Sequence, residues 1–131
     1  MSYLLNVEPR SNYLYITVTG ENSYDNVVHY LTEVRDMFQK YKCSNVLIVE
    51  NLAGASLDTF RIYDLVSKIS EPTTRVECKI AYVDINPEHN ATGMKFTENV
   101  AVNRGVFVRV FFTIQEAEQW LVGEETPGDN I

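Results

Sequence analysis

The stretch Glu50-Asn-Leu-Ala-Gly-Ala-Ser-Leu-Asp58 interrupts an apolar run, precedes a helical pattern, and sets two hydroxyls, Ser56 and Thr59, beside Asp58. At a strand-to-helix turn a hydroxyl can carry a phosphate, which the positive end of the helix stabilises. The carboxylates of Glu50 and Asp58 would repel that phosphate. A helix cap is the simpler interpretation, since Ser or Asp at this position contributes about 1 kcal/mol. We favour a cap and connector, and keep phosphorylation of Ser56 or Thr59, or a place in a ligand pocket, as alternatives.

A second polar cluster, Asp84, Glu88 and His89, follows a later apolar run. These residue types serve as acids, bases and metal ligands, and open α/β sheets usually bind ligands beyond the ends of their strands. The spacing Asp-x-x-x-Glu-His matches no recognised metal-ligand pattern, and His29 is the only other histidine. We therefore expect no metal, and keep a small hydrolase or isomerase built on these three side chains as an alternative hypothesis.

Other motifs that would indicate catalysis or a cofactor are missing from the sequence. No Ser-His-Asp or Cys-His order places a nucleophile in a strained elbow. The glycine-containing stretch Ala53-Gly54-Ala55 is neither a P-loop nor a GxGxxG, so we expect no nucleotide and no cofactor. Cys43 and Cys78 are the only cysteines and form no CxxC, which favours two reduced structural thiols.

The elements that must position these residues follow from apolar periodicity. Alternation of apolar and polar residues indicates half-buried strands, and spacings of three and four indicate helices. The patterns predict the order ββαβαβαβα and one α/β domain with a mixed, mostly parallel five-stranded sheet and helices packed over it. The strands are expected at Tyr3–Val7, Tyr13–Thr19, Val46–Val49, Val76–Val83 and Val106–Phe112. The helices are expected around Val27–Tyr41, Ile62–Ile69, Phe96–Ala101 and Ile114–Leu121.

Local signals sharpen several of these boundaries. Pro72 should end the second helix, because the residue before a proline is pushed out of the helical region. Gly105 fits the position just past the end of the third helix. Thr113-Ile-Gln-Glu116 is a capping box, which predicts the start of the last helix. We expect the domain to span residues 1–122 and residues 123–131 to form a flexible tail.

Length and charge narrow the class of protein. A chain of 131 residues with a net charge of −7 fits one globular domain, and the charge argues against nucleic acid and anionic membranes as partners. No apolar stretch approaches the roughly 20 residues of a membrane span, and the first residues do not resemble a signal peptide. We therefore expect a cytoplasmic protein without stable membrane insertion.

Aromatic residues make up 11% of the chain, and several occupy positions that the sheet alone does not require. Tyr13 and Tyr15 are predicted to point away from the apolar face of their strand. Phe107 and Phe111 are predicted on one side of the last strand and Phe112 on the other. Cover for the sheet is the simplest role; a hydrophobic pocket or a homodimer surface is the alternative.

The element order and the segment Arg104-Gly-Val-Phe-Val-Arg-Val-Phe-Phe-Thr-Ile-Gln-Glu-Ala-Glu-Gln-Trp-Leu121 resemble the SpoIIAA-like family of the STAS superfamily, the sulphate transporter and anti-sigma-factor antagonist domains. The architectural resemblance covers nearly the whole chain, and the specific part covers its last quarter. The residues that carry it are Ala101, Arg104, Gly105, Val108, Phe111, Glu116, Ala117, Trp120 and Leu121.

The resemblance implies a non-catalytic regulatory module that binds proteins or small nonpolar molecules. In such antagonists a serine of an Asp-Ser-Ser-Gly loop is phosphorylated to release a partner kinase. That motif falls here on Asp58-Thr59-Phe60-Arg61, where the acid and one hydroxyl are kept but the second hydroxyl and the glycine are lost. Partner or ligand contacts are expected at the loops after the third and fourth strands. The candidate residues there are Asn51, Ser56, Asp84, Asn86 and His89.

Overall fold

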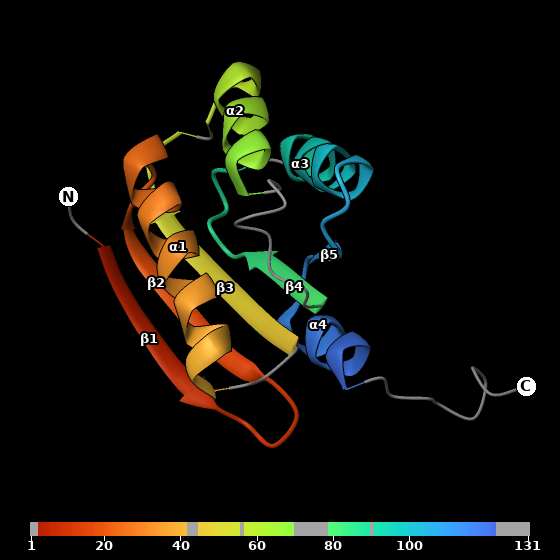
Figure 1. Ribbon diagram of the computed structural model, residues 1–131. Coiled ribbons are helices and arrows are strands. Elements are labelled where there is room, and N and C mark those ends of the chain that lie inside the picture. The colour runs from red at the N-terminus through yellow and green to blue at the C-terminus, as the bar shows by residue number, and fades with distance from the viewer. Residues whose placement is uncertain (1–2, 42–44, 56, 70–78, 90, 123–131) are drawn as a thin grey trace, which may run out of the picture.

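The computed structural model describes residues 3–41, 45–55, 57–69, 79–89 and 91–122. Its strands are β1 (Tyr3–Pro9), β2 (Leu14–Glu21), β3 (Asn45–Ala53), β4 (Lys79–Asp84) and β5 (Val108–Phe111). Its helices are α1 (Tyr24–Tyr41), α2 (Thr59–Ile69), α3 (Ala91–Asn103) and α4 (Ile114–Leu121). The predicted order ββαβαβαβα is confirmed (Figure 1).

The five strands form one sheet in the order β1-β2-β3-β4-β5. β1 runs antiparallel to β2, and every later neighbouring pair is parallel. The predicted mixed sheet is therefore confirmed, and the third and last predicted strands lie in the same sheet with β4 between them. Among the strands that the structure describes, the spatial order follows the chain and never reverses. The sheet thus lacks the reversal at which doubly wound α/β folds open a crevice.

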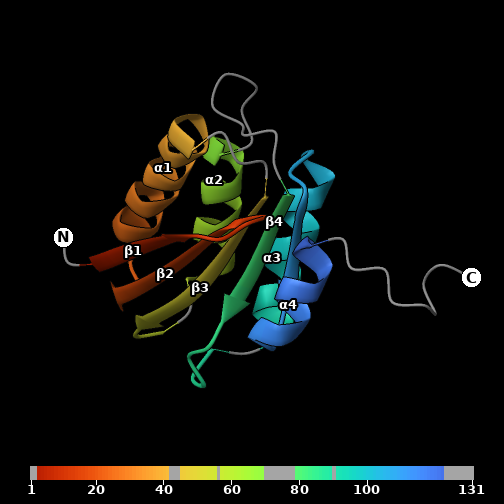
Figure 2. The same cartoon turned by 90° about the horizontal axis from the view of Figure 1, so that it is seen from below.

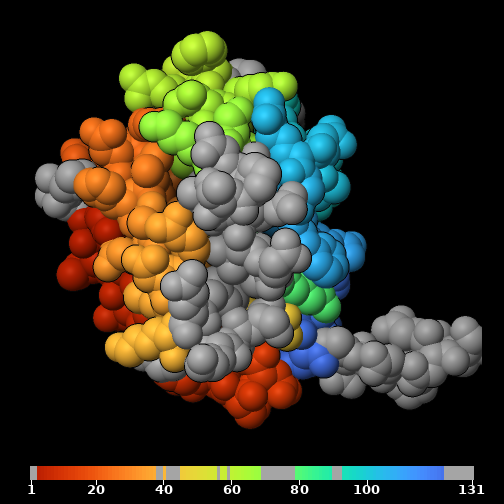
Figure 3. Space-filling model, viewed as in Figure 1, coloured from red at the N-terminus to blue at the C-terminus, as the bar shows by residue number. Residues whose placement is uncertain are grey.

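In the described part of the chain, the sheet has helices on both faces, with α1, α2 and α3 on one and α4 on the other. Successive residues of a strand point to opposite faces, so Leu47 and Ile48 of β3 belong to different layers of the core. On the face of Ile48, apolar residues pack against α1, α2 and α3. On the face of Leu47 they pack against Ala117 and Leu121 of α4. Figure 2 shows α1 and α2 side by side along one side of the sheet, and Figure 3 shows how α1, α2 and α3 cover that side.

Short polar side chains cap the first turns of α1 and α4. The Oγ of Ser23 accepts a hydrogen bond from the N–H of Asn26 in the first turn of α1 (3.1 Å). Thr113 accepts from the N–H of Glu116 (3.2 Å), which confirms the predicted capping box at α4. Each of these bonds satisfies a backbone donor that a helix cannot satisfy itself.

The end of α3 is also as predicted. Gly105 follows the helix with a φ of 89°, a conformation that other residues adopt only under strain. The N–H groups of Gly105 and Val106 turn back to the carbonyls of Val102 and Ala101, both at 3.0 Å. These bonds close the last turn of the helix and aim the chain into β5.

Two expectations need correction. The apolar run Val46–Val49 is only part of β3, which continues through Glu50 to Ala53, so the supposed connector begins later. The last strand is shorter than expected and begins at Val108. For Tyr13 the simplest expected role is confirmed, because it is buried on the face of the sheet that α4 covers.

Some predicted features lie outside the described residues. These are the two cysteines, Ser56, Pro72, the start of the fourth predicted strand at Val76 and the tail at 123–131.

Candidate ligand-binding site

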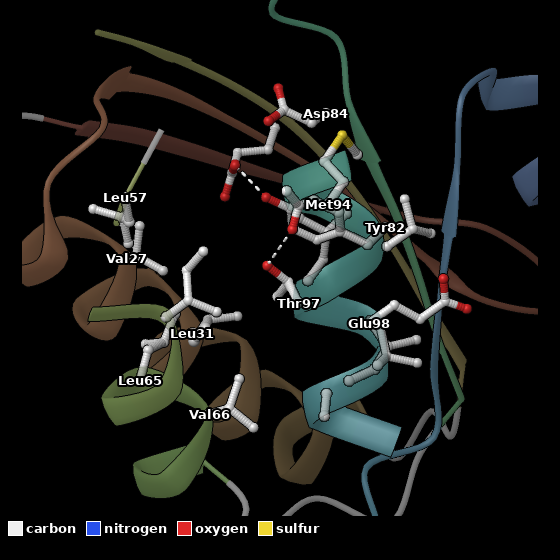
Figure 4. A pocket seen from close by; sticks show the side chains of 18 of the residues that line it. Val27, Leu31, Leu57, Leu65, Val66, Tyr82, Asp84, Met94, Thr97 and Glu98 are labelled. Carbon is white, nitrogen blue, oxygen red and sulfur yellow. Dashed lines mark hydrogen bonds between the residues drawn. The ribbon is translucent and has the colours of Figure 1, made fainter. Parts of the chain in front are cut away.

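A cavity of about 150 Å³ lies between the sheet and the three helices α1, α2 and α3. Most of its wall is apolar. Leu31 of α1 and Leu65 and Val66 of α2 form one side, while Met94 and Thr97 of α3 form another (Figure 4). Ile48 of β3 and further side chains of β4 and β5 line the sheet side. Such a mostly apolar hollow with a few polar groups is the usual composition of a small-molecule site.

Glu50 is the acidic group at the centre of this cavity wall. The pleat of β3 points Glu50 to the same face as Ile48, toward the helices, and its side chain is only 4% exposed. The hydroxyl of Tyr30, from the buried face of α1, donates to Oε2 of Glu50. The hydroxyl of Tyr82, from β4, donates to Oε1. Two phenols from different elements therefore hold the carboxyl group, which burial alone would make costly.

Burial governs the ionisation of this group. It raises the pKa of Glu50 to about 7, against the opposing effect of the two tyrosine hydrogen bonds and with a further increase from the nearby Asp84. The pKa values of Tyr30 and Tyr82 are raised well above the usual range, first by burial and then by Glu50. Near neutral pH both tyrosines thus stay protonated donors, and among these three side chains Glu50 is the one that titrates.

His89 joins the loops after β3 and β4. Its Nδ1 lies 2.6 Å from Oδ2 of Asp84, and its Nε2 lies 2.8 Å from the carbonyl oxygen of Gly54. Both partners are acceptors, so both ring nitrogens are satisfied only when both carry protons. Burial opposes the charged ring, but the bonds to Asp84 and Gly54 outweigh it and raise the pKa of His89. Gly54, at a φ of 105°, turns the first loop toward the ring.

Asn86 adds a second tie between the same loops. It is buried, and its Nδ2 donates to the carbonyl of Leu52 at the end of β3 (2.7 Å). Its Oδ1 accepts from the N–H of Glu88 (2.8 Å), and its own N–H donates to Oδ1 of Asp84 (3.0 Å). Asn86 thus fixes the loop, because its side-chain nitrogen and oxygen both bond to the backbone of this chain.

The other predicted residues are distributed differently. Asp84 and His89 line the cavity, while Asn51 and Glu88 are exposed. Asp58 accepts a hydrogen bond from the N–H of Arg61 (2.8 Å) and so caps α2, as the simpler interpretation predicted. Ser56 and the side chain of Thr59 lie outside the part of the chain that the structure describes.

The central residues of the cavity were missed by sequence reasoning. Glu50 directly follows an apolar run, and we assigned it to a connector because acids rarely continue a buried strand. A signal was present: Ile48, Glu50 and Leu52 keep the alternation of the strand. Tyr30 lies three residues after Val27 and four before Val34, on the buried face of α1. That spacing indicates burial, and a buried phenol needs an acceptor.

Among the described residues, no group of three or more His, Cys, Asp or Glu side chains is arranged to hold a metal ion. No helix in the described ranges combines the length and apolar character that crossing a membrane requires.

No protein-family model matches the sequence, and no curated protein matches it significantly. Among solved structures, the chain is similar to an anti-sigma factor antagonist from Mycobacterium paratuberculosis. The two are 12% identical and superpose with a TM-score of 0.60 over 92% of this chain and 95% of the other. The chain has a STAS-like fold. The predicted fold is thereby confirmed, and at this identity the similarity concerns the fold alone.

Within the STAS-like fold, the cavity lies beneath the helices, whereas the residues predicted as a contact site surround the loops after β3 and β4. Asp84 and His89 belong to both regions, because they follow β4 and also line the cavity. The cavity therefore borders the loop end of the sheet, with Glu50 on its wall.

Proposed function

We propose that this chain is a non-catalytic STAS-like binding module that holds a small, mainly nonpolar molecule in the cavity beneath α1, α2 and α3. The observation that carries the proposal is a mostly apolar cavity in which the hydroxyls of Tyr30 and Tyr82 converge on the carboxyl group of Glu50. A hollow of this kind leaves packing energy unused, which a ligand of matching shape recovers.

The size of the cavity limits the ligand. An apolar protein cavity of about 150 Å³ binds benzene, and this cavity has the same volume, about 150 Å³. We therefore propose a molecule not much larger than a single six-membered ring. Lipids and most cofactors are far larger than this.

A thermal melt with benzene tests the proposal. We expect benzene to raise the melting temperature of the wild type, because it binds only the folded state. Ala101→Leu adds three carbon atoms to the cavity wall and should abolish the increase. Val102→Leu on the exposed side of the same helix is the matched control and should keep it. No increase in the wild type, up to the solubility of benzene, would contradict the proposal.

The enzyme alternative depends on Asp84, Glu88 and His89. A general base must be free to take a proton, and both nitrogens of His89 already face acceptors. Glu88 is exposed and engages Asn86 through its backbone. We therefore propose that His89 holds the two loops together. His89→Ala should leave benzene binding in place, whereas any hydrolase or isomerase activity lost in this variant would favour the enzyme.

Regulation through protein partners is a further part of the proposal. The similar structure is named as an anti-sigma factor antagonist, and we infer that this chain also contacts proteins, through the loops after β3 and β4. The phosphorylation switch is not favoured, since Asp58 caps α2 and the serine-glycine part of the motif is absent. Intact mass spectrometry of protein purified from its own cell tests this view, and a stoichiometric phosphate on Ser56 or Thr59 would reverse it.

A further inference from the structure

The carboxyl group of Glu50 has hydrogen-bonding capacity left over. An ionised carboxylate accepts about four hydrogen bonds, two at each oxygen. Tyr30 donates to one oxygen and Tyr82 to the other. Both tyrosines line the cavity together with Glu50, so the remaining acceptor positions belong to a carboxyl group on the cavity wall. A ligand that donates hydrogen bonds completes this group.

The charges around the cavity favour one kind of donor. β4 and its loop contribute the Asp84 and His89 pair, in which a protonated ring offsets the carboxylate. α3 contributes Glu98, whose carboxylate lies 2.9 Å from Nζ of Lys95 at the surface. The remaining titratable side chains of the lining are Glu50 and its two tyrosines; α2 and β5 contribute apolar side chains alone, and the described lining holds no Lys or Arg. His89 is the one cation of the described lining and attracts Glu50 from a distance, but its ring is paired with Asp84, so Glu50 makes no ion pair of its own on the cavity wall.

We infer that the ligand of this cavity is a small apolar amine, whose ammonium group binds the carboxylate of Glu50 while its hydrocarbon body fills the apolar part. This inference rests on the proposed function and names the class of molecule. The ammonium supplies both hydrogen bonds and the missing positive charge. The hydroxyls of Tyr30 and Tyr82 hold the carboxylate in place for this contact.

Other head groups fit less well. A carboxylic acid would place a second acid beside Glu50, where one of the two must keep its proton. A plain hydrocarbon would leave the acceptor positions of Glu50 buried without partners once it excludes water from the cavity. An alcohol supplies one donor but no charge. An amine satisfies the oxygens and also removes the electrostatic penalty of burying the carboxylate.

The protonation of Glu50 makes the inference measurable. Burial raises its pKa to about 7 in the empty cavity. An ammonium favours the ionised form, so its binding below that pH must release a proton. The affinity for an amine should therefore rise from about pH 5.5 to about pH 7.5, by roughly tenfold or more.

Isothermal titration calorimetry with benzylamine, benzyl alcohol and toluene tests the inference on the full chain. We expect benzylamine to bind the wild type most tightly near neutral pH, and Glu50→Gln to weaken it by about tenfold or more, as expected for a lost charge-assisted hydrogen bond. Toluene should bind both proteins alike. Glu118→Gln is the matched control, because Glu118 also accepts a hydrogen bond from a tyrosine hydroxyl, that of Tyr13, but lies on α4, on the other face of the sheet, and it should leave benzylamine affinity unchanged.

The outcomes separate the two proposals. If toluene binds and benzylamine does not, or if Glu50→Gln binds benzylamine as the wild type does, the amine inference is wrong and the nonpolar site stands. If none of the three compounds binds the wild type, both proposals fail. The pH series needs no variant, so it decides the question even if Glu50→Gln does not fold: a benzylamine affinity that stays flat with pH overturns the inference.

Discussion

The two faces of the sheet solve the same packing problem differently. Beneath α4, the strand residues Leu47, Ala81 and Val83 are fully buried against Ala117 and Leu121. Beneath α1, α2 and α3, equally apolar strands leave a cavity of about 150 Å³. One helix can lie directly against the strands, whereas three helices that meet over the sheet leave space where their side chains do not reach.

Polar groups are placed accordingly. On the α4 face the buried tyrosine, Tyr13, reaches outward to Glu118 at the rim of the helix (2.5 Å). On the other face Glu50 lies in the interior and depends on Tyr30 and Tyr82. A buried carboxyl group detracts from stability unless it is well paired, so its presence beside the cavity points to binding rather than to packing.

The largest effect is expected from opening a void on the closed face. Leu47→Ala should lower the free energy of unfolding by about 2–5 kcal/mol, because the transfer energy is lost and a cavity is left behind. Chemical denaturation measures this. Phe112→Ala, at a side chain that is 61% exposed, is the control and should change stability by no more than about 0.5 kcal/mol. A small loss for Leu47→Ala would show that the α4 face is not closely packed.

The next effect concerns pH on the hollow face. Burial raises the pKa of Glu50 from 4.5 to about 7, so the folded state keeps a proton that the unfolded state releases in this window. The stability that this bound proton contributes is fully present below about pH 4.5 and is lost as the pH rises through about 7. At about 1.4 kcal/mol per pKa unit, the loss is roughly 3 kcal/mol.

Glu50→Gln has no group that titrates at this position. Between about pH 4.5 and about pH 7, the wild type should therefore lose roughly 3 kcal/mol of unfolding free energy that the variant keeps. Denaturation of both proteins across the pH range measures the difference. If the unfolding free energies of the two proteins change in parallel with pH, the pKa of Glu50 is not raised on folding. Water would then reach the carboxylate, and the face beneath α1, α2 and α3 would not be as dry as we infer.

A third prediction compares an added side chain on each face. Ala117→Leu overfills the closed face and should lower the free energy of unfolding by about 1–3 kcal/mol. Ala101→Leu adds the same atoms to a helix that borders the cavity, where there is space for them, and should be clearly less destabilising. Equal losses, measured by denaturation, would remove the distinction between the faces.

The smallest effects are expected at the helix ends. Asp58→Ala at α2 and Thr113→Ala at α4 each remove one capping bond, and each should cost about 0.5–2 kcal/mol. Similar values would show that the faces differ in packing and not in the stability of their helices. If only one of the two variants lost stability, part of the difference between the faces would come from the stability of the helices themselves.

The sequence predicted the fold because its signals are local. Each of these signals depends on residues only a few positions apart in the sequence. They are the periodicity of α1, the capping box at Thr113 and the turn at Gly105, and all three are present in the structure. The continuous apolar run at Val46–Val49 correctly indicated a strand covered on both faces.

The site could not be predicted in the same way, because its contacts join distant segments. Glu50 meets tyrosines 20 and 32 residues away, and His89 meets Gly54 at a separation of 35 residues. An acid after an apolar run looks like the end of a strand until its partners are known. Asp84 and His89 were found because they follow a strand, but their mutual bond was not visible in their spacing.

The unreversed strand order has a consequence for how the chain is made. Each strand pairs with the one synthesised just before it, and the first pair is a hairpin that forms from neighbouring residues alone. Emerging from the ribosome, the polypeptide can add β3, β4 and β5 one after another to an existing edge, without holding a place open for a later segment. The topology thus allows the sheet to grow in one direction, from the hairpin toward the carboxyl terminus.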